Sequence, residues 1–129
     1  MTSRVLVTGI PRSGKTVFAG DGALHADDLV QDGADWSDQS ETIASDWMQR
    51  SGPWTIEGVA VVRALRKWMQ RNEGKPADVV YWLDDPRVPL SLGQKAMARG
   101  CRTIWSEVRP ELERRGVEVR YGVEFGKPA

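Results

Sequence analysis

The sequence Gly9-Ile10-Pro11-Arg12-Ser13-Gly14-Lys15-Thr16 decides the fold, because it fits the pattern G-x-x-x-x-G-K-[ST] at every fixed position. Glycines at this spacing let the backbone wrap so that successive N–H groups point inward at phosphate oxygens. The pattern assigns Lys15 to the β- and γ-phosphates and the Thr16 hydroxyl to Mg²⁺. We therefore predict a site for ATP, or another nucleoside triphosphate, with Mg²⁺. The residues expected to line it are Gly9, Pro11, Arg12, Ser13, Gly14, Lys15, Thr16 and Val17.

The segments on either side of this motif have the patterns that a phosphate-binding loop needs. The apolar run Arg4–Gly9 is typical of a buried strand. A short helix is expected through Thr16–Ala19, and Gly20 and Gly22 should end it. A strand before the motif and a helix after it is the arrangement that supports the prediction.

The rest of the chain alternates between short apolar runs and helical stretches. Further strands are predicted at 23–26, 54–58, 78–83 and 117–121. Helices are predicted from an N-cap at Asp38 with Glu41 three residues on to Gly52-Pro53, at 61–71, and over 91–115 with interruptions at Gly93, Gly100 and Pro110. Such alternation favours a parallel sheet with helices on both faces. We expect one α/β domain over residues 1–129, a three-layer P-loop fold whose mostly parallel sheet has about five strands.

Composition and charge narrow the function. Lys plus Arg and Asp plus Glu each number 18, so general binding to nucleic acid is not expected. No run of about 18 apolar residues and no signal-peptide pattern occur, so we expect a cytoplasmic protein without membrane contact. Cys101, the single cysteine, leaves no internal disulfide and no cysteine-based zinc cluster.

These features resemble the P-loop nucleoside triphosphatase superfamily, in which residues 9–16 match the Walker A motif. Within it, the chain looks most like the small nucleoside and nucleotide kinases, on three further stretches. These are Asp27-Asp28 after the second strand, Glu57-Gly58 after the third, and Val79–Pro86 through the fourth. The resemblance implies a kinase-like transferase that moves the γ-phosphate to a small-molecule or nucleotide acceptor.

Acidic residues at strand ends are the candidate catalytic and metal-binding groups, because ligands bind beyond the carboxyl ends of parallel strands. Asp27 is expected to orient an acceptor hydroxyl, to take its proton or to hold a Mg²⁺-bound water, and Asp28 is a weaker candidate. Both have the alternative of a solvated loop or a helix cap. Glu57 in an apolar strand is expected to be a Mg²⁺ water ligand or a catalytic base. Its alternative is a salt bridge to Arg63 or Arg66.

Two other functions remain open from the sequence. Asp84-Asp85 has the form of a Walker B pair, with Asp84 on Mg²⁺ and Asp85 polarising water. An ATP hydrolase would then use this pair or Glu57 to orient the water. The short helix after the motif and the little room for a lid are also compatible with a non-catalytic regulatory or assembly protein. No Asn-Lys-x-Asp motif for guanine occurs, which argues against a signalling GTPase.

Basic residues after the fourth strand are candidates for stabilising the transition state. Lys95, Arg99 and Arg102 are spaced to share one face of a helix. In the small kinases, arginines in this region close over the phosphates, and the resemblance implies that catalytic role for Arg99 and Arg102. The alternative is a solvated basic face.

The remaining candidates are aromatic or lie near the end of the sequence. His25, the only histidine, is expected to pack or to form a hydrogen bond beside the sheet, because phosphoryl transfer needs no histidine. Trp36 and Trp54 flank loops, so one of them is a candidate for stacking on a base. Residues 126–128 are a further candidate for base contacts.

Overall fold

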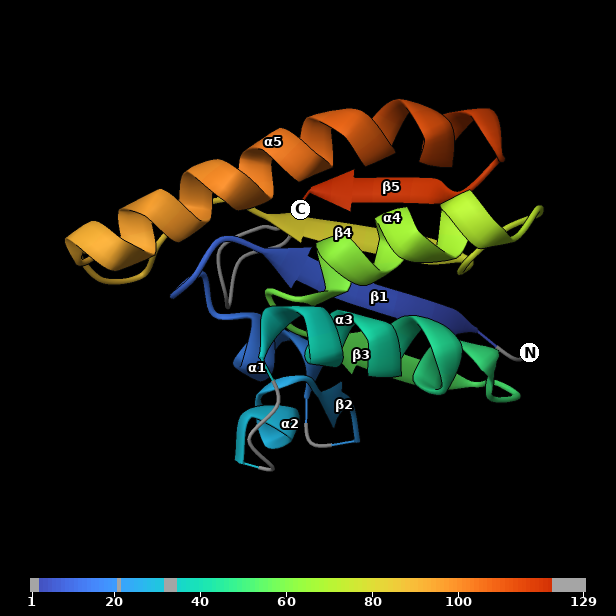
Figure 1. Ribbon diagram of the computed structural model, residues 1–129, viewed down its shortest axis with the longest axis horizontal. Coiled ribbons are helices and arrows are strands. Elements are labelled where there is room, and N and C mark those ends of the chain that lie inside the picture. The colour runs from blue at the N-terminus through green and yellow to red at the C-terminus, as the bar shows by residue number, and fades with distance from the viewer. Residues whose placement is uncertain (1–2, 21, 32–34, 122–129) are drawn as a thin grey trace.

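A computed structural model describes residues 3–20, 22–31 and 35–121, in which a five-stranded parallel sheet carries helices on both faces (Figure 1). The strands are β1 (Arg4–Gly9), β2 (Leu24–His25), β3 (Trp54–Glu57), β4 (Val79–Leu83) and β5 (Glu118–Tyr121). The helices are α1 (Lys15–Ala19), α2 (Asp27–Gln31), α3 (Trp36–Ser45), α4 (Val61–Arg71) and α5 (Leu92–Arg114), with a 3₁₀ turn at Trp47–Gln49. The predicted α/β architecture is confirmed, and the described sheet is parallel throughout.

The strand order β2-β3-β1-β4-β5 makes the first strand the central one. From β1 the chain runs to β2 at one end of the sheet, past β3. From β3 it runs in the opposite direction, past β1, to β4. Because crossovers between parallel strands are right-handed, α1 covers one face of the sheet and α3, α4 and α5 cover the other. Connections that leave neighbouring strands in opposite directions open a crevice at their carboxyl ends. That crevice lies between β1 and β3.

The register of the strands assigns alternate side chains to the two faces. The face toward α3, α4 and α5 carries the buried residues Leu6, Ile56 and Val80. One residue further along β3, Glu57 points to the opposite face, which it shares with α1. On that face the ring of Phe18 from α1 contacts Tyr81 of β4, with 5.0 Å between ring centroids. Glu57 therefore lies on the side of the sheet where residues 9–16 lead into α1.

The helix α4 has the bounds and the buried stripe that its sequence predicts. Its buried residues are Val61, Val62, Ala64, Leu65, Trp68 and Met69. Burial of side chains of this size stabilises a fold by about 1.5–3 kcal/mol each, so this stripe is a large part of the core. Figure 1 shows α3 and α4 lying across the front of the sheet.

The helix predicted from Asp38 to Gly52 has different ends. Asp35 is the N-cap, because its backbone is extended and its carboxylate accepts a 2.8 Å hydrogen bond from the N–H of Asp38. Asp38 therefore lies in the first turn. The helix ends at Ser45, and the chain tightens into the 3₁₀ turn that follows, as is frequent at helix C-termini.

The helix α5 is continuous over 23 residues, so the predicted interruptions at Gly93, Gly100 and Pro110 are wrong. A buried stripe along it overrides the weak local propensities: Ala98, Cys101, Ile104, Trp105, Val108 and Leu112. Trp105 stacks on Trp82 of β4, with ring centroids 4.8 Å apart. Pro110 is on the exposed side, where water can solvate the carbonyl that loses its partner. None of the helices in the described ranges, this long one included, has the length and apolar character to span a membrane.

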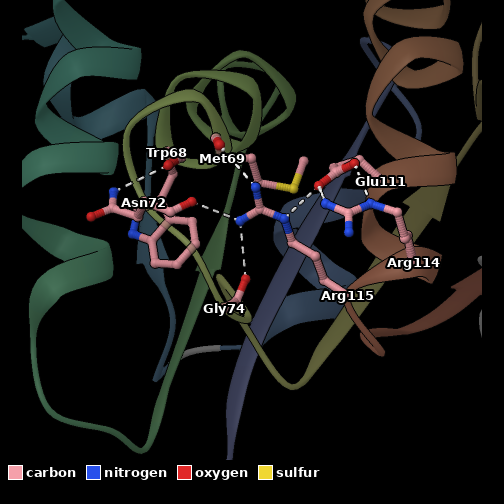
Figure 2. Close-up of polar contacts among 7 residues, drawn as sticks. All are labelled: Trp68, Met69, Asn72, Gly74, Glu111, Arg114 and Arg115. Carbon is pink, nitrogen blue, oxygen red and sulfur yellow. Dashed lines mark hydrogen bonds and ion pairs between the residues drawn. The ribbon is translucent and has the colours of Figure 1, made fainter.

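At the amino edge of the sheet, Arg115 ties the end of α4 to the end of α5 (Figure 2). Its guanidinium donates to the carbonyls of Met69, Asn72 and Gly74 at 2.9, 2.8 and 3.1 Å, and to the carboxylate of Glu111 at 2.7 Å. The last carbonyls of a helix have no partner within that helix. Arg115 supplies partners at the end of α4, and its side chain is only 12% exposed.

Candidate phosphate-binding site

Two glycines give loop 9–16 its shape, Gly9 by allowing a close approach to β4 and Gly14 by its left-handed backbone. A Cβ added at Gly9 would lie 2.0 Å from the carbonyl oxygen of Leu83, so the close approach of β1 to β4 requires glycine. Gly14 has φ 82°, in the left-handed region, and directly precedes α1. Arg12 has φ 61°, a conformation that non-glycine residues seldom adopt and that is often found at functional sites.

The backbone N–H groups from Arg12 to Thr16 donate to no other residue in the part of the chain that the structure describes. Elsewhere in proteins most backbone N–H groups away from water are paired. Successive unpaired N–H groups in a curved loop are typical of anion-binding concavities. The loop is therefore suited to a phosphate group.

The ammonium group of Lys15 is folded back onto its own loop. Its Nζ donates to the carbonyl of Ile10 at 2.6 Å and to the hydroxyl of Ser13 at 3.3 Å. The residue is only 7% exposed. Burial lowers the pKa of Lys15, and the nearby Glu57 carboxylate partly opposes this shift. A buried cation with only neutral hydrogen-bond partners would gain from an incoming polyanion.

The carboxylate of Glu57 is fixed by donors from α1 and β2. Its Oε1 accepts from the hydroxyl of Thr16 at 3.2 Å and from Nδ1 of His25 at 2.7 Å, and the residue is 2% exposed. The salt bridge to Arg63 or Arg66 that the sequence allows is not formed. Arg66 pairs with Glu107 instead, at 3.2 Å.

These groups surround one pocket of about 360 Å³ at the carboxyl ends of β1 and β3. Its lining consists of Pro11, Arg12, Gly14, Lys15, Thr16, Asp27, Glu57, Gly58, Val59, Gln94 and Met97. The structure thus brings together most of the predicted loop residues with two of the predicted carboxylates, Asp27 and Glu57. Gly9 and the buried Ser13 support the loop from behind, and the side chain of Val17 lies outside what the structure describes.

Asp27 reaches the pocket from the first turn of α2, which begins directly after β2. The second strand is thus shorter than the predicted 23–26, and Asp27 and Asp28 belong to a helix rather than to a loop. Both residues are exposed, but only Asp27 is part of the pocket lining.

The predicted residues after β4 are not brought to the pocket lining. Asp84 accepts from Nε of Arg102 at 2.8 Å and from the indole of Trp82 at 3.2 Å. This hydrogen bond to Asp84 raises the pKa of Arg102. Arg99 is exposed on α5.

Helical geometry explains which residues of α5 reach the pocket. Gln94 and Met97, three positions apart, line it. Lys95, Arg99 and Arg102 start one position later, and one residue turns a helix by about 100°. These three side chains are therefore directed away from the pocket.

Four residues around the carboxylates and the loop were not assigned to this site from the sequence: His25, Val59, Gln94 and Met97. Only Gln94 has a partial signal, since Ser91-x-x-Gln94 is a capping box, which fixes where α5 begins. The Oε1 of Gln94 accepts from the N–H of Ser91 at 3.0 Å. Position at the start of α5 does not by itself predict a place beside loop 9–16.

The oxygen atoms available to Mg²⁺ here are the hydroxyl of Thr16 and the carboxylates of Asp27 and Glu57. Within the described ranges, no group of three or more His, Cys, Asp or Glu side chains could hold a metal by itself. Mg²⁺ in nucleotide sites usually takes one or two protein oxygens and completes its shell with phosphate and water. The residues fit a magnesium ion that arrives with a triphosphate.

The candidates for base contacts are not supported at this site. Trp54 is buried at the start of β3, at the amino edge, and its indole donates to the carbonyl of Arg50 at 2.9 Å. The side chain of Trp36 and residues 126–128 lie outside the described part of the chain. Comparisons of the chain with protein-family models and with curated proteins find no match.

Proposed function

We propose that this chain is a small P-loop phosphotransferase that binds ATP, or another nucleoside triphosphate, with Mg²⁺ on residues 9–16. It transfers the γ-phosphoryl group to a small-molecule or nucleotide acceptor. The observation that carries the proposal is the shared pocket of Lys15, Thr16, Asp27 and Glu57, bounded by loop N–H groups that have no acceptor among the described residues. This combination suits a polyanion on one side and a hydroxyl on the other.

The loop side of the pocket would hold the phosphates. Lys15 exchanges the carbonyl of Ile10 for phosphate oxygens, and the N–H groups of the loop donate to the same anion. Because Lys15 is buried, its attraction to the transferring phosphoryl group is less screened than it would be in water. These contacts position the phosphate chain and stabilise charge that develops on its oxygens.

The carboxylate side of the pocket would serve the acceptor. Asp27 orients the acceptor hydroxyl and accepts its proton as the oxygen attacks. Thr16 and Glu57, joined by their hydrogen bond, would hold Mg²⁺ directly or through water. When bound, the ion neutralises negative charge on the phosphates.

The test is ADP formation from ATP and Mg²⁺ with a panel of nucleosides, nucleotides, sugars and 5′-hydroxyl oligonucleotides. Acceptor-dependent ADP is expected, and Asp27→Asn should reduce kcat by about 100-fold or more, since general-base catalysis contributes about 10²–10⁴-fold. Asp28→Asn is the matched control, because this neighbouring carboxylate is outside the pocket lining. It should retain the activity.

Other results would redirect the assignment. ADP that forms without any acceptor and is lost in Glu57→Gln would indicate a hydrolase. Triphosphate binding without ADP would indicate a regulatory or assembly protein. Absence of triphosphate binding at millimolar concentration would overturn all three functions together.

A further inference from the structure

We infer that His25 is a positioning residue that aims the Glu57 carboxylate into the proposed phosphotransferase pocket. The His25–Glu57 contact follows from the geometry of β2 and β3, whereas its effect on metal binding rests on the proposed function. His25 is absent from the pocket lining, so it acts through Glu57 rather than on a ligand.

Strand pairing brings the two residues together. His25 and Glu57 are register partners in the parallel pair of β2 and β3, so their side chains stand side by side on the α1 face. The 2.7 Å contact joins Nδ1 of the ring to Oε1 of the carboxylate. The positioning role that we infer has the carboxylate as acceptor and the ring as donor, which requires a proton on Nδ1.

The two oxygens of Glu57 have different roles. Oε1 accepts from both His25 and Thr16, whereas Oε2 has no hydrogen-bond partner among the described residues. Among the described side chains, the polar atoms that are inaccessible to solvent and have no hydrogen-bond partner are Nε of Arg63 and Nε1 of Trp68. Oε2 of Glu57 is not one of them, so this unpaired oxygen retains contact with solvent. Because Glu57 lines the pocket, we infer that this oxygen faces it.

The hydrogen bond from His25 is the stronger of the two restraints on this carboxylate. It is 0.5 Å shorter than the bond from Thr16, at 2.7 Å against 3.2 Å. Without it, the carboxylate keeps one long contact to a hydroxyl that Mg²⁺ would also engage. Outer partners of this kind commonly change metal affinity or activity by about 10–100-fold when removed.

A pair of substitutions separates positioning from packing. In His25→Asn, Nδ2 is bonded to Cγ as Nδ1 is in histidine, so a donor remains at the same place. In His25→Leu, the apolar bulk remains and the donor is lost. Positioning predicts that Asn outperforms Leu, whereas a packing role for this partly exposed ring predicts the reverse.

The first measurement is binding of Mn²⁺, as a paramagnetic substitute for Mg²⁺, in the presence of a non-hydrolysable ATP analogue. His25→Leu should weaken Mn²⁺ binding by about 10–100-fold, and His25→Asn should recover most of that loss. Analogue binding without metal should be equal in the two variants, which also reports that both are folded. Equal Mn²⁺ affinity in Leu and Asn, or weaker binding in Asn, would overturn the inference.

The second measurement needs no ligand. Because the chain contains one histidine, ring ¹⁵N resonances can be assigned to His25 without ambiguity. A proton on Nδ1 is expected, and a bare Nδ1 with the proton on Nε2 would contradict the pairing. If wild-type protein bound neither the analogue nor Mn²⁺, the proposed function would fail, while the ¹⁵N spectrum would still decide the His25–Glu57 contact.

Discussion

A cation lies at each end of the parallel strands, the buried Lys15 at the carboxyl edge and the partly buried Arg115 at the amino edge, and the two have different hydrogen-bond partners. Arg115 at the amino edge donates to three carbonyls in or just after the last turn of α4 and to one carboxylate, so its charge is paired and most of its donors are used within the chain. Lys15 at the carboxyl edge donates to one carbonyl and one hydroxyl of its own loop, and to no carboxylate. A cation with all of its partners inside the fold stabilises the fold, whereas one with few partners is available to a ligand.

Replacement of Lys15 should have the largest effect on binding. Lys15→Met keeps a similar stem and removes the charge, so triphosphate affinity should fall by about 100-fold, as expected for a lost hydrogen bond between charged groups. The free energy of unfolding should not fall, since burial already disfavours the charged form of Lys15. Calorimetric titration and urea unfolding measure the two quantities. Strong loss of stability would show that Lys15 belongs to the fold as Arg115 does.

The same variant gives a pH test with a definite sign. The pKa of Lys15 is lowered in the folded chain below 10.5, so the folded state binds the proton less tightly than the unfolded state. Stability of the wild type relative to Lys15→Met should therefore rise as the pH increases from neutral toward 10.5. A relative stability that falls over this range would mean that the cation is favourably paired.

Replacement of Arg115 should have the largest effect on stability. Arg115→Ala should lower the free energy of unfolding by about 2–3 kcal/mol, because the donors to the α4 carbonyls are lost. Arg114→Ala is the matched control: Figure 2 shows Arg114 bound to Glu111 alone, and its side chain is 70% exposed. It should change stability by less than about 0.5 kcal/mol.

Triphosphate affinity per folded molecule should be the same in both arginine variants. If Arg115→Ala weakened binding in fully folded protein, the separation between the two edges would be lost. Urea unfolding and calorimetric titration on the same samples make this comparison.

Protonation of Glu111 should give the smallest effect. Hydrogen bonds from Arg114 and Arg115 lower its pKa from 4.5 to about 2. Its contribution is therefore present above pH 4.5 and disappears as the pH falls toward 2. The stability difference between wild type and Glu111→Gln should shrink over that window. A difference that stayed constant would show that the carboxylate does not help to hold Arg115.

The sequence predicted those parts of the molecule that depend on local pattern. Residues 9–16, the strand before them and the stripe of α4 follow from spacing alone, and the parallel sheet follows from alternation. The predicted interruption of α5 was wrong, because the free energy gained by burying six side chains along one stripe exceeds the helix-propensity cost of its glycines and proline.

Sequence position anticipated the neighbours in the pocket only where residues are close in the chain or end a strand. Asp27 after β2 and Glu57 at the end of β3 both line the pocket beside loop 9–16, as the ends of parallel strands suggest. His25 was missed as a partner of Glu57, because that contact depends on the pairing of β2 with β3. Asp84 and Arg102 bind each other across 18 residues, a choice of partner that no local spacing reveals.

The close contact at Gly9 has a mechanical consequence. The residue that opens loop 9–16 is also the point where two central strands nearly touch, since a methyl group there would meet the carbonyl of Leu83. Any larger side chain at this position would clash with the backbone of β4 and force β1 and β4 apart. The pairing of β1 with β4 and the start of loop 9–16 thus depend on the same residue, and neither can be changed at Gly9 while the other is kept.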